Sequence, residues 1–460
     1  MRYKIDINQI KKDMINPNQF NHKSSQRIRI LPFTTGYKDE IYNWDAIVGE
    51  ISRLSMGKET EEEIIAEKVF ENILKLVDTK QKDVLIKFMK ELYFKENGEI
   101  EPFHPSVFAY TSFSKQAKNE QKNIGRFIYD VLIRNQCEEE FKKLYLAEGD
   151  LVVSLLKQAL PKFKLYIPGE ADYIVHESKV VEVFKEDLKM LLQDEKLFIK
   201  WIKQFIEYYY FFYVSQTVLK LNQRLRAKEE LIPLYFLVGS ERGGRDRMSS
   251  KQGFKLLKAA NENTFANVML CQFLNYNEYS ESVYTFSEWY KQYRETATDE
   301  EIEEYVKEIQ SFIEFYKEEL PNIPWQQLDL PANKALDPLE QVLDHAFAHI
   351  KFQFVKGGRK SAAQKYESWF YKFVSERYAK NGGSLGYLLH MDEEILLFLI
   401  GLTIGGQEKE RLNVVFEQLE CRGIFFDDYS KQYIVEMLEV RNLLEKKSDS
   451  GDAKYVRAIL

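Results

Sequence analysis

The chain has 460 residues, a formal net charge of −7 and three cysteines. This length allows two or three domains with a large core, and the negative charge excludes a protein that coats nucleic acid over its whole surface, so any DNA contact must be a local patch. Cys137, Cys271 and Cys421 are far apart and form no CxxC pair, which argues against a disulfide framework or zinc site and favours reduced core thiols.

The sequence predicts a soluble, cytoplasmic protein with no membrane partner. The N-terminus lacks the apolar core of a signal peptide. The most apolar later stretch, Tyr208 to Leu219, has about twelve uncharged residues, whereas a membrane-spanning helix needs roughly twenty.

Residues 1–160 are predicted to form an N-terminal helical region. Residues 1–35 look irregular or weakly stranded. From Trp44 to Leu54 the apolar residues recur at helical spacing, and Gly57 would end that helix. Further amphipathic helices are expected as far as Pro161.

Residues 161–320 are predicted to form a central helical region. Phe163 to Ile167 alternates like a strand, and residues 173–175 are a possible pairing partner. Glu195 to Ala227 is the longest predicted helix, and its aromatic residues occupy nearly every face. We therefore expect other helices to surround it.

Three prolines mark residues 321–336 as a linker, and residues 337–460 follow as a C-terminal region. This region begins with a helical hairpin, predicted at Asp337–Lys356 and Ser361–Lys380. The expected fold class is mainly α, a multi-helix bundle with a few short strands and a winged-helix-like module at the C-terminal end.

The winged-helix prediction comes from the order of elements after Asp392. Three helix-like runs are followed by a turn at residues 449–452 and an alternating segment from Ala453 to Ile459. The third helix of such a module usually enters a DNA major groove. However, residues 392–460 hold fourteen acidic and nine basic side chains. We therefore expect a docking or structural winged helix; the alternative is direct DNA contact, mainly through the basic wing with Lys446, Lys447, Lys454 and Arg457.

The most positive window of the chain lies in the predicted hairpin. From Lys351 to Lys380 there are eight basic and two acidic residues, with Tyr366, Trp369, Phe370 and Tyr371 interleaved. Such a window is either a solvated helix face over a core or a DNA-backbone contact. The candidate phosphate-binding residues are Lys356, Arg359, Lys360, Lys365, Lys372 and Arg377.

A second basic candidate is the glycine-containing loop from Gly239 to Lys251. Its glycines have the separation of a phosphate-binding loop, but Arg245 and Asp246 replace the lysine and the hydroxyl residue, which disfavours nucleotide hydrolysis. The alternatives are a solvated loop and a surface loop whose arginines meet DNA phosphate or an acidic partner. The arginines are Arg242, Arg245 and Arg247.

Other patterns give no convincing catalytic site. His345 and His349 have the spacing of half a metal site, but no third ligand is recognisable. Asp172 and Glu177 are too close in sequence to be ligands from separate strands of a nuclease. A non-catalytic protein is therefore expected, with no metal and no cofactor.

Two stretches resemble a known family. Residues 442–456 and the early segments Leu31–Phe33 and Trp44–Glu50 are similar to the DptG (DndG) family, the G subunit of the bacterial DNA phosphorothioation-dependent restriction complex. That family works with F and H subunits, which carry the ATP-binding motors, and together they restrict DNA that lacks the sulfur modification.

The resemblance implies a non-catalytic phage-defence subunit that scaffolds its ATPase partners and contacts double-stranded DNA. Two alternatives remain. A winged-helix DNA-binding regulator would be expected to have a basic third helix, which Glu436 and Glu439 disfavour. A nuclease subunit of an unrecognised class would need clustered carboxylates.

Overall fold

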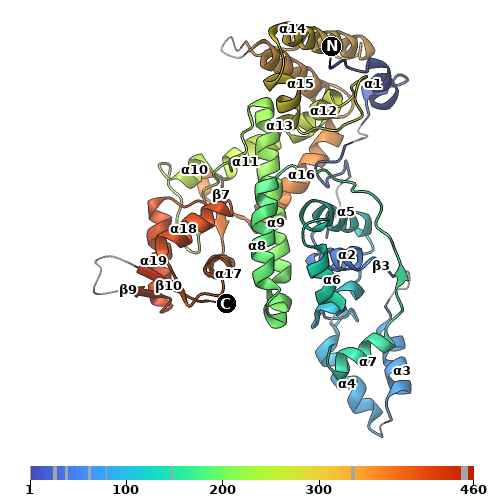
Figure 1. Ribbon diagram of the computed structural model, residues 1–460, viewed down its shortest axis with the longest axis vertical. Coiled ribbons are helices and arrows are strands. Elements are labelled where there is room, and N and C mark those ends of the chain that lie inside the picture. Colours follow the sequence, from blue (N-terminus) through green and yellow to red (C-terminus); the bar gives the residue numbers. More distant parts are fainter. Residues whose placement is uncertain are drawn as a thin grey trace. The chain divides into compact units, whose positions relative to one another are not determined.

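The computed structural model of the chain describes residues 2–23, 28–36, 40–60, 64–78, 80–146, 149–332, 337–446 and 454–459 (Figure 1). It is mainly helical with a few short strands, which confirms the predicted fold class at this level. No helix within these ranges is both long and apolar enough to cross a membrane.

The chain divides into two compact units that alternate along the sequence. The first unit comprises Met1–Tyr37, Val214–His390 and Phe425–Asp427, and the second comprises Lys38–Tyr213, Met391–Ile424 and Asp428–Leu460. These units do not follow the expected ranges 1–160, 161–320 and 337–460. Residues 321–332, the described part of the expected linker, belong to the first unit.

The first unit is built mainly from helices around aromatic side chains. Its helices are α1 (Ile7–Met14), α10 (Met248–Lys251), α11 (Phe254–Asn261), α12 (Thr264–Leu274), α13 (Phe286–Trp289), α14 (Asp299–Glu319), α15 (Pro338–Lys356) and α16 (Lys360–Arg377). Its strands are β1 (Ile15–Asn16) paired with β2 (Asn21–His22), and a three-stranded sheet in the order β5 (Leu237–Val238), β7 (Tyr387–Met391), β6 (Ala379–Asn381).

Two expectations about this unit were wrong. Residues 1–35 were expected to be irregular or weakly stranded; the short strands β1 and β2 are present, but the helix α1 was missed. Asp6 accepts a hydrogen bond from the Gln9 N–H and begins α1, whose Ile10 and Met14 are buried one turn apart. The second helix of the hairpin ends at Arg377 instead of Lys380, because the chain after it joins β7 as the antiparallel strand β6.

The helices α14 and α15 pack on each other (Figure 1). Thr298 and Glu301 form a reciprocal capping box at the start of α14. After α14 ends, the Trp325 Nε1–H donates to the Leu320 carbonyl, and its ring lies 5.5 Å from His349 of α15. The start of the proline-containing segment therefore packs against α15.

The second unit holds the other helices and two small sheets. Its helices are α2 (Trp44–Met56), α3 (Ala66–Leu76), α4 (Lys82–Tyr93), α5 (Lys118–Ile128), α6 (Glu138–Leu146), α7 (Leu151–Ala159), α8 (Ser178–Leu191), the part of α9 (Glu195–Gln223) up to Tyr213, α17 (Glu393–Ile404), α18 (Leu412–Cys421) and α19 (Asp428–Val440). A 3₁₀ helix, η1, spans Pro105–Tyr110.

The predicted Phe163–Ile167 strand is present in part, with a different partner. Lys164–Leu165 forms β4 and pairs antiparallel with β3, Lys58–Glu59, which directly follows the predicted helix cap at Gly57. The other sheet has the order β8 (Lys409–Arg411), β10 (Lys454–Arg457), β9 (Leu444–Lys446), with both pairings antiparallel. The predicted turn at residues 449–452 lies outside the described residues.

The aromatic helix α9 is surrounded as predicted. Its aromatic residues Trp201, Phe205, Tyr208, Tyr209, Phe211, Phe212 and Tyr213 are all buried. Within the second unit the Trp201 ring stacks on Phe398 of α17 at 4.5 Å. The Tyr209 hydroxyl donates to the Asp187 carboxylate of α8 at 2.5 Å.

Asp187 also forms a buried ion pair with Arg422. The guanidinium donates from Nε at 2.8 Å and from Nη2 at 2.5 Å, and both side chains are at most 5% exposed. Burial opposes the charge of Arg422, but the Asp187 carboxylate outweighs burial and raises the pKa of Arg422. The pair joins α8 to the residue that follows α18, 235 positions later.

We expect Asp187→Ala to lower the free energy of unfolding by about 3–5 kcal/mol, because it leaves Arg422 buried without its counter-charge. The double variant D187L/R422M should be clearly more stable than D187A, since it removes both charges. Urea denaturation followed by circular dichroism would measure both. A D187A protein within about 1 kcal/mol of wild type would contradict this account.

Candidate nucleic-acid interface

The helix α16 buries one side and exposes cations on the others. Its buried residues recur at helical spacing: Ala363, Tyr366, Trp369, Phe370, Phe373 and Val374. The Tyr366 ring lies 5.3 Å from Phe33, and the Trp369 Nε1–H donates to the Gly36 carbonyl at 2.7 Å. Most of the aromatic residues interleaved in this window therefore form core and are not open to stack on bases.

The predicted cations of α16 do not lie in one row. Lys360, Lys365 and Arg377 are exposed, and Lys372 is half-buried. Lys365 and Lys372 are seven positions apart and so project from nearly the same side of the helix. Exposed Glu376 follows Lys372 by one turn on that side and partly offsets its charge.

Of the two candidates next to the hairpin turn, only Lys356 is exposed. Arg359 is half-buried, and its Nε–H donates to the His22 carbonyl at 3.1 Å. Burial, together with the charge of Arg359, lowers the pKa of His22 to about 3, so that imidazole is neutral. Arg359 therefore fastens the turn to the N-terminal segment.

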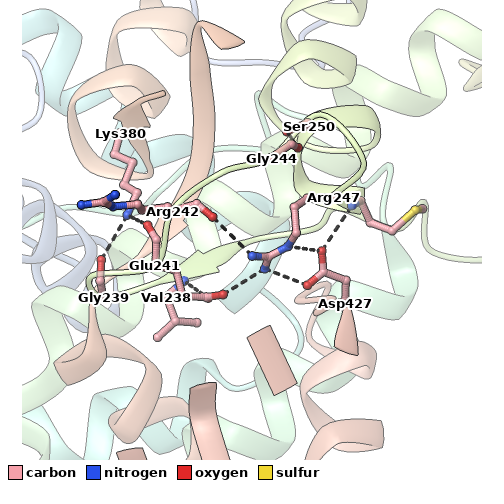
Figure 2. A network of polar contacts seen from close by, with 10 residues as sticks. Val238, Gly239, Glu241, Arg242, Gly244, Arg247, Ser250, Lys380 and Asp427 are labelled. Carbon is pink, nitrogen blue, oxygen red and sulfur yellow. Dashed lines mark hydrogen bonds and ion pairs between the residues drawn. The ribbon is translucent and has the colours of Figure 1, made fainter. Parts of the chain in front are cut away.

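In the loop after β5, Arg247 is held by two carboxylates (Figure 2). Its guanidinium lies 2.7 and 2.8 Å from the two oxygens of Asp427 and donates to Glu241 at 2.9 Å. Glu241 in turn accepts from the Val238 N–H at 2.7 Å. This predicted DNA contact is thus an internal brace of the loop.

The same loop is closed from the other side by Lys380 of β6, whose ammonium donates to the Gly239 and Glu241 carbonyls (Figure 2). The Ser250 hydroxyl donates to the Gly244 carbonyl at 2.7 Å. With its backbone fixed in this way, the loop presents Arg242 and Arg245, which are exposed and form no ion pair within the described part of the chain. They are the arginines of the loop that remain open to a ligand.

Further exposed lysines lie on the neighbouring helix α11. The Phe254 ring packs 5.7 Å from Tyr371 of α16, and the Asn261 amide donates to the Glu367 carbonyl at 2.8 Å. This packing puts the Lys258 ammonium 5.9 Å from the Tyr371 ring. Lys255 and Lys258 were not among the predicted candidates. The sequence signal that could have identified them is the spacing of Lys251, Lys255 and Lys258, which is that of one helical face.

We use the name "basic group" for the exposed cations on the loop, α10–α11 and the middle of α16. Within the first unit the loop leads into α10, α10 contacts α11, and α11 contacts α16. The group comprises Arg242, Arg245, Lys251, Lys255, Lys258 and Lys365.

The predicted wing is less available. Lys446 forms an exposed ion pair with Glu439 at 2.9 Å, which lowers the pKa of that carboxyl. Lys447 lies outside the described residues. On α19, Lys431 pairs with Glu420, while the next residue after the helix, Arg441, pairs with Glu393. Exposed Glu436 and Glu439 leave the helix surface unfavourable for phosphate.

The other candidate positions have structural roles. The His345 Nε2 lies 3.3 Å from the Pro331 carbonyl, and the His349 Nδ1 lies 2.8 Å from the His345 carbonyl. Asp172 lies 3.4 Å from Arg126. Within the described ranges no group of three or more histidine, cysteine or acidic residues is placed to hold a metal ion.

Glu367 is an acidic side chain in the middle of α16. Burial raises the pKa of Glu367 to about 8 from an ordinary value of 4.5, although a hydrogen bond from Phe265 and the charge of Lys351 oppose the shift. The folded protein therefore favours the neutral carboxyl. The contribution of Glu367 to stability is greatest below pH 4.5 and is lost as the pH rises through 8.

We expect Glu367→Gln to unfold at a higher temperature than wild type at pH 8 to 9, with the difference shrinking toward pH 4.5. Thermal unfolding across this pH range tests the effect. Glu376→Gln, an exposed change on the same helix, serves as the control and should show a nearly constant difference. An equal response of the two variants would contradict the assignment.

We compared the chain with known protein-family models and with curated proteins, and neither comparison gave a match.

Proposed function

We propose that this protein is a non-catalytic subunit of a bacterial phosphorothioation-dependent restriction complex, which scaffolds the ATPase F and H subunits and contacts double-stranded DNA. The observation that carries the DNA contact is the basic group. Its arginines Arg242 and Arg245 are exposed, form no ion pair among the described residues, and extend from a loop whose backbone is braced by Arg247 and Lys380.

A local basic group suits a subunit with a net charge of −7. Lysine and arginine that reach phosphates release condensed counterions, so each contact adds affinity at low salt without any reading of sequence. A subunit of this kind would hold the duplex, and its partners would act on it. The assignment to the restriction complex rests on the resemblance of residues 442–456 and of the two N-terminal stretches.

We infer that the C-terminal module is a winged helix used for docking. Two features support the fold: the element order α17, β8, α18, α19, β9, β10, and a sheet that places the last strand between the other two. The exposed side of α19 favours a role in protein docking and disfavours the reading of DNA bases. Tyr429 and Val440 are 70% and 83% exposed. They are about three helical turns apart, and Glu436 is about two turns after Tyr429, so the three side chains lie on the same side of α19.

The first test is binding to a short DNA duplex over a series of salt concentrations. We expect R242E/R245E/K365E to bind at least about tenfold more weakly and to reduce the salt slope by about 3, one for each lost phosphate contact. Fluorescence anisotropy would measure both quantities.

The matched control is K307E on the acidic helix α14, an exposed lysine outside the basic group. It should bind within about twofold of wild type. Equal weakening by K307E, or no binding by wild type at low salt, would overturn the DNA contact and leave only the scaffold role.

A separate test addresses the partners. When the chain is co-expressed with the F and H subunits, we expect Y429A/V440S to lose at least one of them on affinity purification, because truncating exposed anchors removes interface area. The same variant should keep wild-type DNA binding. Full co-purification of both partners with the variant would remove α19 as the docking surface.

A further inference from the structure

Two tyrosines of the first unit lie at its surface, next to the basic group. Tyr387, the first residue of β7, is 42% exposed, and Tyr371 of α16 is half-buried. We call these two residues the aromatic pair. The buried Phe254 ring of α11 packs against both of them, with centroid distances of 5.4 Å to Tyr387 and 5.7 Å to Tyr371. One buried ring therefore supports both surface rings.

A tight hairpin holds Tyr387 in place. The strands β6 and β7 pair antiparallel with Asn381 opposite Tyr387, and the Gly382 N–H donates to the Gly386 carbonyl at 2.7 Å. Gly386 has φ +75° and ψ −155°, a combination that is essentially restricted to glycine. Because the turn fixes the backbone before Tyr387, a ligand that contacts this side chain has little conformational freedom to remove.

Two lysines of α11 flank the aromatic pair. The Lys258 ammonium lies 5.9 Å from the Tyr371 ring, and Lys255 directly follows Phe254. Both lysines are exposed. Lys258 also lies 3.8 Å from Glu262, but the two side chains are 48% and 61% exposed, so this ion pair is weak. Phosphate groups can therefore reach positive charge directly beside the rings.

The loop of the basic group packs on the same hairpin as Tyr387. A Cβ atom at Gly243 would lie 2.2 Å from the Leu388 Cδ1 and 3.2 Å from the Leu385 Cδ1, so any larger residue would collide with the hairpin. Glycine thus lets the loop backbone contact the chain on both sides of Tyr387. The exposed arginines of the loop stand on either side of this glycine in the sequence, and exposed Asp246 offsets part of their charge.

We propose that the aromatic pair and the cations around it bind single-stranded DNA. Unpaired bases stack on Tyr387 and Tyr371, and the phosphates contact the exposed cations of the loop and of α11. Stacking needs an exposed base face, which a duplex keeps inside its own base stack, so the aromatic pair favours unpaired strands over duplex. This inference rests on the proposed DNA contact and adds a second substrate class to it, the unpaired strand.

The test is fluorescence anisotropy of the full-length protein with a labelled oligothymidylate of about 12 nucleotides and, separately, with the labelled duplex. Wild type is expected to bind the single strand saturably. Tyr387→Ala should weaken this binding at least about fivefold, because it removes a stacking ring, and should change duplex binding by less than about twofold. Tyr387→Phe keeps the ring and should bind the single strand within about twofold of wild type.

Two controls separate stacking from charge. Tyr279→Ala removes a tyrosine that is 56% exposed and lies outside the basic group, and it should leave the affinity for the single strand unchanged. An abasic strand of the same length carries the same phosphates without bases. Wild type should bind it at least about fivefold more weakly than oligothymidylate, and Y387A should bind it as wild type does.

Equal affinity of wild type and Y387A for oligothymidylate would overturn the proposal, and so would equal affinity of wild type for the abasic strand and oligothymidylate. The abasic comparison uses wild type alone, so it decides the question even if Y387A is destabilised. Wild type that binds duplex but no single strand refutes this inference alone. Binding of the single strand through Tyr387 without duplex binding refutes the duplex contact alone.

Discussion

The burial of α9 from Phe205 to Tyr213 on every side is the constraint on which the second unit depends. A helix of this kind is stable in water only if its polar tips find partners inside the protein. They do: the Tyr208 hydroxyl donates to the Arg422 carbonyl, that of Tyr209 to Asp187, and that of Tyr213 accepts the His176 N–H at 2.7 Å. The Asp187–Arg422 pair therefore belongs to the same network as the aromatic core.

In the first unit, several cationic side chains form internal contacts that stabilise the fold and are therefore not available to a ligand. Arg224 donates to Asp344 at 2.5 Å and lies 4.4 Å from the Phe347 ring. Arg247, Arg359 and Lys380 bind carboxylates or backbone carbonyls. A count of charged residues in a sequence window includes these internally bound cations. The electrostatic potential at a DNA-binding surface depends mainly on the cations that remain exposed.

The elements with local signals could be predicted from the sequence. Residues close together in the sequence determine three such features: the helix cap at Gly57, the capping box of Thr298 and Glu301, and the aromatic helix α9. The two-residue strands β3 and β4 could not be paired, since they are too short for periodicity and more than a hundred positions apart.

For the candidate interface, the sequence identified the basic loop and the basic helix. It could not distinguish Arg245 from Arg247, because the distinction depends on Asp427, 180 positions after Arg247. It also missed Lys255 and Lys258, whose relevance comes from the packing of α11 on α16.

The alternation of the two units along the chain has a consequence for synthesis on the ribosome. Tyr3 packs 5.2 Å from Trp289 and 5.7 Å from Tyr305, so its aromatic core forms only after nearly three hundred further residues have been synthesised. The second unit likewise needs Arg422 to neutralise Asp187. Each unit can therefore complete its core only late in synthesis, and until then the aromatic side chains of the nascent chain lack their final packing partners.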